Sequence, residues 1–160
     1  MDFSTEKTSV DIVDTLVDFI GNFEGCANCK KDGLIYAYLC PAGYPTQGYG
    51  LLVKDLNVPP ITKEEAKNRF KKVLPTYISH AIRLSPNIAT DPKRLLAITS
   101  FIFNLGPTAY AGSTLRKKVN AQDWTGAAQQ IVRWNKGGGR VLKGLTTRRL
   151  AEANLLIQDT

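Results

Sequence analysis

Three residues in the first third of the chain have side chains that could do acid–base chemistry at one site. Glu24 lies between Phe23 and Gly25, and it is followed by Cys40 and Thr46, which have five residues between them. A carboxyl group can donate a proton to a leaving oxygen, especially where an adjacent apolar residue removes it from water and raises its pKa. A thiol and a hydroxyl can hold or activate a water molecule. We therefore predict that this stretch contains an active site.

The elements that must position these residues are a helix and a small sheet. Apolar residues recur every three or four positions through 10–23, with aspartates between them, which predicts an amphipathic helix ending near Glu24. Residues 1–9 are polar and are predicted to be frayed. From 34 to 53, tyrosines and apolar residues alternate with Pro and Gly, which indicates short antiparallel strands and tight turns. Such a sheet is stable only when it packs against helices.

The remainder of the chain is predicted to be helical. The run 95–103 is apolar nearly all round and is the candidate for a buried central helix. Pro75 is predicted to kink or end the helix that contains it. The glycines at 137–139 indicate a flexible hinge or a loop of close approach. Helix N-caps are predicted at Thr62, Asp91, Ser113, Asp123 and Thr147.

Composition is that of one globular domain. The chain has 160 residues, of which 43% are hydrophobic and 22% charged. Its net charge of +7 favours anionic partners, such as nucleic acid, acidic lipid or a wall polymer. The apolar stretch 10–20 contains three aspartates, which argues against a membrane span, and no secretory signal is visible.

Three cysteines are too few for a disulfide-stapled scaffold and indicate a reducing compartment. Cys26 and Cys29 form a CxxC pair, but His80 is the only histidine and Cys40 the only further thiol. A structural zinc site normally has four ligands, so two loop thiols are the favoured interpretation, with a redox pair as the alternative. No metal or cofactor is predicted.

These residues, in this order, resemble the phage-type lysozymes, the endolysin glycosidases that include the T4-like and lambdoid lysozymes. The resemblance extends over about residues 10–157. It begins with Phe23-Glu24-Gly25 and continues with Cys40, five residues, and Thr46-Gln-Gly-Tyr-Gly. Further matches are FIFNLG at 101–106, Ser113-Thr114-Leu115-Arg116, and Gly144-Leu145 with Arg148-Arg149 before Glu152.

The resemblance implies an α+β, mainly helical fold with two lobes in a single lysozyme-like domain, 1–160. A small antiparallel sheet lobe would cover about 25–60. A larger helical lobe would cover about 61–160 together with the N-terminal helix.

The resemblance also implies hydrolysis of the β-1,4 bond between N-acetylmuramic acid and N-acetylglucosamine in peptidoglycan. Glu24 carries over as the general acid, Cys40 as the family's Asp/Cys position, and Thr46 as the residue that helps hold the attacking water. The residues expected to line the sugar subsites are Leu52, Phe103 and Thr114.

The biological setting that the resemblance implies is lysis of the host cell at the end of a phage infection. Peptidoglycan is the expected partner, with no nucleic acid and no stable membrane insertion, and a monomer is expected. The protein would accumulate in the host cytoplasm and act on the wall after release through a separate holin-type protein.

Two departures from the family pattern affect the site. Fifteen residues separate Glu24 from Cys40, more than is usual, and Leu51 stands where the family commonly has His. Because a thiol with the ordinary pKa of about 8.5 is mostly protonated at pH 7, Cys40 can place water, attack the sugar as a thiolate, or act electrostatically. Asp32 is an alternative carboxylate, although a loop aspartate is more often a turn residue.

Two other functions remain open from the sequence. A lytic transglycosylase also needs one glutamate but forms an anhydromuramic product without water. A non-catalytic basic module would bind wall polymer or nucleic acid, although no nucleic-acid motif is recognised. The segment 136–149 contains basic residues and no acidic residue. Its cations form either a solvated basic face that attracts anionic partners or an ion pair between Arg140 or Arg148 and Glu24.

Overall fold

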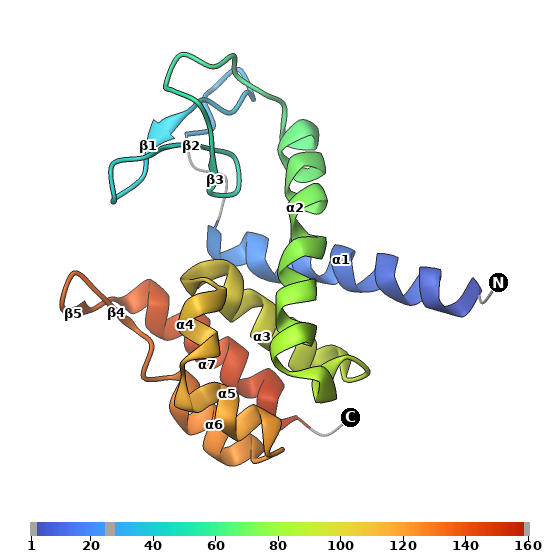
Figure 1. The fold of residues 1–160 in the computed structure, drawn as a ribbon. Helices are drawn as coiled ribbons and strands as arrows, with labels where there is room; N and C mark the ends of the chain where they lie inside the picture. Colours follow the sequence, from blue (N-terminus) through green and yellow to red (C-terminus); the bar gives the residue numbers. More distant parts are fainter. Residues whose placement is uncertain (1–2, 25–27, 159–160) are drawn as a thin grey trace. The chain divides into compact units, whose positions relative to one another are not determined.

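The structure of the protein is a computed structural model (Figure 1). It describes the backbone of residues 3–24 and 28–158, and the side chains of 12–23 and 28–158. The chain forms two compact units, Met1–Leu74 and Pro75–Thr160. Among the described residues, no helix has an apolar stretch long enough to cross a membrane.

The first unit contains one long helix, a small sheet and the first part of a second helix (Figure 1). The long helix begins seven residues before the predicted start at Val10. The sheet is antiparallel in the order β1-β2-β3, and it pairs Tyr38 with Thr46 and Thr46 with Leu52. The elements are α1 (Phe3–Glu24), β1 (Tyr38–Leu39), β2 (Pro45–Gln47), β3 (Leu51–Leu52) and α2 (Lys63–Leu84).

The small sheet is held in place by a buried glutamine. Gln47 donates from Nε2 to the carbonyl oxygens of Ile35, at 3.0 Å, and Pro59, at 3.1 Å. Its Oε1 accepts from Arg69 at 3.2 Å, so the whole amide group is hydrogen-bonded. Ile35 also exchanges two backbone hydrogen bonds with Ile61, of 2.8 and 3.0 Å. The sheet is thereby fixed to the segment that leads into α2.

Helix α2 does not end at Pro75 but runs through it to Leu84. Proline has no N–H to give to the carbonyl of Lys71, four residues earlier. Both residues are exposed, so water can satisfy that carbonyl and the cost of the proline is reduced. The boundary between the two units falls at this proline.

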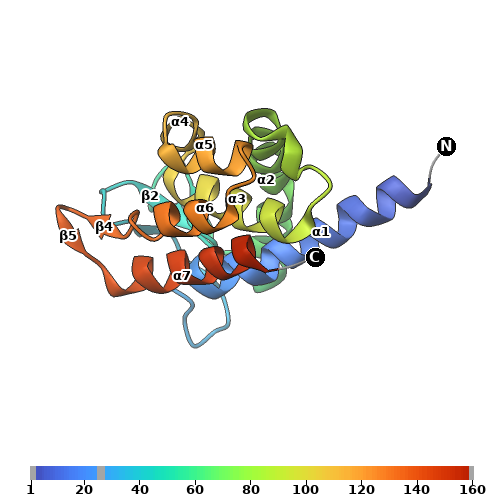
Figure 2. The same ribbon diagram turned by 90° about the horizontal axis from the view of Figure 1, so that it is seen from below.

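The second unit is built around α3, whose residues from Leu95 to Ile102 are all buried. The predicted central helix is therefore confirmed. Helix α7 packs along α3 and α6 (Figure 2). The elements after α2 are a 3₁₀ turn η1 (Pro86–Ile88), α3 (Pro92–Leu105), α4 (Pro107–Ala111), α5 (Thr114–Asn120), α6 (Trp124–Ile131), β4 (Lys136–Gly137), β5 (Arg140–Val141) and α7 (Lys143–Ile157).

Four of the five predicted N-caps are confirmed. The side chains of Thr62, Asp91, Ser113 and Asp123 each accept from the backbone N–H three residues later, at 3.0 to 3.4 Å. The prediction for Thr147 is wrong, because α7 already begins at Lys143 and the Thr147 hydroxyl donates to the carbonyl of Lys143. Of the preceding glycines, Gly138 and Gly139 form the turn of the β4–β5 hairpin and not a hinge. The alternative of close approach is confirmed at Gly137 in β4, where an added Cβ would lie 2.6 Å from Leu142 Cδ1.

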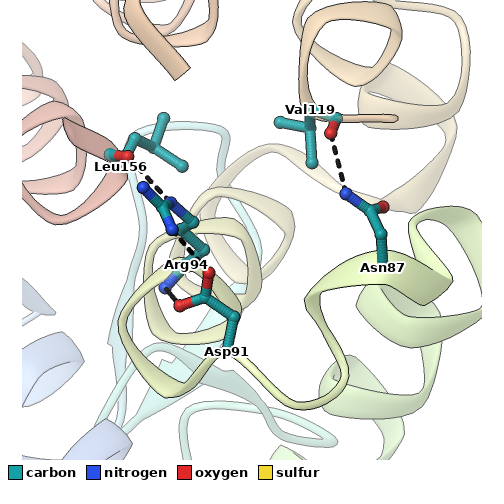
Figure 3. A network of polar contacts seen from close by, with 5 residues as sticks. All are labelled: Asn87, Asp91, Arg94, Val119 and Leu156. Carbon is teal, nitrogen blue, oxygen red and sulfur yellow. Dashed lines mark hydrogen bonds and ion pairs between the residues drawn. The ribbon is translucent and has the colours of Figure 1, made fainter. Parts of the chain in front are cut away.

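Arg94 links three helices of the second unit (Figure 3). Its guanidinium forms a 2.7 Å ion pair with Asp91 and donates from Nε to the carbonyl oxygen of Leu156 at 3.0 Å. The same group lies 4.1 Å from the ring centroid of Trp124, a cation–π contact. The start of α3 is thus fixed to the end of α7 and to α6.

Asn87 makes a second polar link in this unit (Figure 3). Its side-chain amide donates to the carbonyl oxygen of Val119, near the end of α5, at 2.9 Å. The same carbonyl also accepts from the Gln122 N–H at 3.0 Å, so the Asn87 amide supplies a further hydrogen bond to this helix end. Together the two links join segments that are far apart in the sequence: the start of α3 with α6 and α7, and η1 with α5.

Candidate active site

Glu24 is the last residue of α1. Its backbone belongs to the helix, while its side chain, Gly25 and Cys26 lie outside the described residues. The preceding Phe23 packs edge-on against Phe19, with ring centroids 5.2 Å apart. The predicted position of Glu24 at the end of the N-terminal helix is therefore confirmed, and its role stays a prediction.

Cys40 and Thr46 are brought together by a tight turn between β1 and β2. Cys40 directly follows β1, and Thr46 lies in the middle of β2. The turn is closed by hydrogen bonds from the Cys40 N–H to the Tyr44 carbonyl, 3.0 Å, and from the Gly43 N–H to the Cys40 carbonyl, 2.8 Å. Gly43 has φ +86°, a conformation that favours glycine.

The turn also lowers the pKa of the Cys40 thiol below its ordinary value. A hydrogen bond from the backbone of Tyr44 has the largest effect, and partial burial of the thiol opposes it. Smaller contributions in the same direction come from the backbone of Ala42 and Gly43 and from the Thr46 side chain. Donors that point at a sulfur atom stabilise its anion, so the turn favours the thiolate.

Thr46 has one hydroxyl proton and two acceptors within reach. In the structure, its Oγ1 donates to the carbonyl oxygen of Tyr44 at 2.9 Å. Its hydrogen bond with Cys40 requires the same proton to turn toward the sulfur. The buried Thr46 hydroxyl can therefore donate to the Tyr44 carbonyl when Cys40 is a neutral thiol, and to the sulfur atom when Cys40 is a thiolate.

Replacing Thr46 with Val is expected to raise the pKa of Cys40, because a donor to the thiolate is lost. In a background without the other two thiols, Cys26→Ser/Cys29→Ser, the pH profile of alkylation by iodoacetamide should shift to higher pH. Thr46→Ser keeps the hydroxyl and should keep the parent profile. Identical profiles for Thr46→Val and the parent would show that Thr46 does not act on the thiol.

The three residues predicted to line the sugar subsites fall in different units. Leu52 lies in β3 opposite Thr46 and on the same face of the sheet, and 72% of it is exposed. Phe103 lies in α3 of the second unit, where its ring is 4.9 Å from that of Tyr77. Thr114 is the exposed first residue of α5. The first unit thus brings Cys40, Thr46 and Leu52 together.

Asp32, the alternative carboxylate, is a turn residue. It accepts from the Leu34 N–H at 2.9 Å and from the Tyr36 hydroxyl at 2.7 Å. These bonds, with that of Tyr36 the stronger, hold the pKa of Asp32 below its ordinary value. An ionised carboxylate with both oxygens occupied in its own loop is poorly suited to proton donation.

The residues that sequence reasoning missed are those that shape the site without reacting. Tyr44 acts through its backbone, and Gln47 fixes the strand that carries Thr46. The signal for the turn was present in Pro41 and Gly43, which are typical turn residues. No pattern indicates that the glutamine amide is buried.

Comparison with known proteins identifies the family. The sequence profile of the phage lysozyme family matches residues 21–152. An endolysin of Acyrthosiphon pisum secondary endosymbiont phage 1 is 33% identical over 131 residues, which cover 79% of this chain and 89% of that protein. A protein of Bacteriophage PS119 named SAR-endolysin is 35% identical over 135 residues, covering 81% and 78%.

Solved structures agree with this result. The endolysin from Escherichia coli O157:H7 phage FAHEc1 superimposes with a TM-score of 0.74 at 28% identity, over 89% of this chain and 90% of that one. The muramidase domain of SpmX from Asticaccaulis excentricus gives a TM-score of 0.75 at 25% identity, over 91% and 96%. The mainly helical fold with a small antiparallel sheet is thus confirmed, and the chain belongs to the phage lysozyme family.

Proposed function

We propose that the protein is an endolysin that hydrolyses the β-1,4 bond between N-acetylmuramic acid and N-acetylglucosamine in peptidoglycan. The observation that carries the proposal is the Cys40–Thr46 pair, held together by the β1–β2 turn in the unit whose long helix ends in Glu24. Membership of the phage lysozyme family and the likeness to a muramidase domain support the substrate class.

In this proposal, Glu24 protonates the leaving glycosidic oxygen and is the general acid. Cys40 and Thr46 hold and activate the water that attacks the sugar. The lowered pKa of Cys40 supports a thiolate that accepts a proton from this water, while the Thr46 hydroxyl orients it. Leu52, Phe103 and Thr114 contact the sugar rings.

The cellular role we propose is lysis of the host at the end of a phage infection. The protein works as a monomer and a single lysozyme-like domain. It accumulates in the host cytoplasm and reaches the wall after a separate holin-type protein opens the membrane. Names of relatives support action on the wall, since three of the proteins compared above are called endolysin or SAR-endolysin.

Product analysis tests the reaction. Digestion of purified peptidoglycan should release fragments with new reducing ends, each heavier by one water than the anhydro product of a transglycosylase. Mass spectrometry separates the two, and an anhydro product would overturn the proposed hydrolysis.

The same digestion tests the role of Cys40. Cys40→Asp places a carboxylate at the position where the family has Asp or Cys, so it should remain active. Cys40→Ser has a hydroxyl that stays protonated at neutral pH, and it should be at least about tenfold slower if the thiolate acts as a base. If the parent and both variants digest peptidoglycan at equal rates, Cys40 takes no part in the reaction.

A further inference from the structure

The net positive charge of the protein comes from the second unit. Residues 75–160 contain twelve Lys and Arg and four Asp and Glu, a net charge of +8, whereas residues 1–74 contain nine and ten, a net charge of −1. The described acids of the second unit are neutralised internally: Asp91 by Arg94, Asp123 by Lys118, and Glu152 by Arg148 and Arg149. The charge that this unit presents to solvent is therefore strongly positive.

The β4–β5 hairpin and the start of α7 concentrate this charge. No acidic residue occurs between 124 and 151. Figures 1 and 2 show the hairpin as a projection at one end of α7. Its exposed residues include Lys136, Arg140 and, in the first turn of the helix, Lys143. A positive patch of this kind attracts anionic surfaces over about one Debye length.

Two aliphatic side chains lie among these cations. Val141 is 59% exposed and Leu142 40% exposed. Val141 pairs with Lys136 across the hairpin, so the two side chains share a face. We call Lys136, Arg140, Val141, Leu142 and Lys143 the hairpin surface. Leu150, 53% exposed, extends it along α7, because it lies seven residues after Lys143 on the same helix face.

The hairpin surface is fastened to α7 by hydrogen bonds. Gly138 and Gly139, with φ +59° and +82°, form its turn. The Leu142 N–H donates to the carbonyl of Asn135 at 2.9 Å, and the Asn135 side chain donates to the Thr146 hydroxyl at 3.1 Å. These bonds fasten the hairpin to the first turn of α7. Its cations and aliphatic groups therefore lie together before binding, so binding does not include the entropic cost of ordering a loop.

We propose that the hairpin surface docks the protein on membranes that contain anionic phospholipids. Lys and Arg next to exposed aliphatic side chains match a lipid interface, where phosphates meet the cations and acyl chains receive the apolar groups. A nucleic acid or a wall polymer would use the cations alone or with aromatic rings, and residues 135–145 contain no aromatic residue. The docking is peripheral and involves no spanning segment.

The test measures binding of the full chain to two kinds of vesicle, one of phosphatidylcholine and one of equal parts phosphatidylcholine and phosphatidylglycerol. The parent should sediment with the anionic vesicles only. Lys136→Gln/Lys143→Gln should weaken this binding on the order of tenfold. Lys54→Gln/Lys63→Gln removes the same charge from exposed positions of the first unit and should have little effect. Equal losses in the two double variants would overturn the proposal.

Val141→Ser distinguishes lipid from a phosphate polymer. It keeps every charge but removes the apolar contact, so vesicle binding should fall roughly fivefold, while binding to inorganic polyphosphate should be unchanged. Unchanged vesicle binding would mean that the surface recognises phosphate and not lipid. All variants should digest purified peptidoglycan at the parent rate, which separates this proposal from the proposed function. If these variants also digest peptidoglycan more slowly, the hairpin surface binds peptidoglycan and not lipid.

Discussion

Glu24→Gln is expected to leave a folded protein that releases reducing ends from peptidoglycan about a hundredfold to ten-thousandfold more slowly than the parent. Glutamine has nearly the same shape as glutamate but cannot donate the proton that the leaving oxygen needs. Because Glu24 is the last residue of α1, the change lies at a helix end and not within a packed helix interior. The rate should be measured on purified peptidoglycan, together with thermal unfolding of the variant.

A matched control is available in the same unit. Glu64 is an exposed glutamate in the first turn of α2, so Glu64→Gln removes one carboxylate without touching the proposed site. This control should retain the parent rate. If Glu24→Gln digests peptidoglycan as fast as the Glu64 variant, another residue is the general acid.

The largest expected effect on stability is that of Glu152→Ala. Glu152 is fully buried, and its carboxylate forms a 2.7 Å ion pair with Arg149 Nε and accepts from Ser100 Oγ at 2.6 Å. Arg148 Nε lies 3.6 Å away. Without this carboxylate, two guanidiniums remain adjacent in the core of the second unit. Removing one partner of such a buried pair typically costs about 3–5 kcal/mol of the free energy of unfolding.

The position of Glu152 on α7 explains why it serves both arginines. It lies four residues after Arg148 and three after Arg149, the two spacings that bring side chains together on a helix. Ser100 lies on α3, and its carbonyl oxygen also accepts from Arg148 at 3.1 Å. The cluster therefore joins α7 to the central helix α3.

Urea unfolding checks this prediction. Ser100→Ala removes one hydrogen bond but keeps both ion pairs, so it should cost only about 1–3 kcal/mol. Glu152→Gln keeps the shape and loses the charge, and it should fall between the two. A loss below about 1 kcal/mol for Glu152→Ala would show that the cluster contributes little net stability.

Features with a local cause were predictable from the sequence. The caps at Asp91, Ser113 and Asp123 depend on a side chain and a backbone N–H three residues apart, and all three are confirmed. The central helix followed from its apolar run. The helix that ends at Glu24 and the strand-and-turn segment that contains Thr46 followed from local residue patterns, which require no knowledge of distant contacts.

Features that depend on tertiary contacts were not predictable in the same way. Thr147 has the residue type of an N-cap, but α7 starts four residues earlier, after the hairpin positions Leu142. The glycines at 137–139 permit a hinge as readily as a turn, and only the pairing of Lys136 with Val141 decides between them. The thiol environment of Cys40 likewise arises from backbone groups that the turn brings together.

The attachment of the sheet through Gln47 and the Ile35–Ile61 pair also bears on how the gene can change. Ile35 and Gln47 both follow residues 28–33 of the long connection from Glu24 to Cys40, and Cys29 is paired with Ile35 by an antiparallel β-bridge. The register of Cys40 and Thr46 is set by the pairing of β1 with β2, which lies downstream of residues 28–33. Codons gained or lost in 28–33 therefore leave the spacing of Cys40 and Thr46 unchanged. We expect this part of the connection to accept insertions and deletions while the proposed Cys40–Thr46 pair is inherited unchanged.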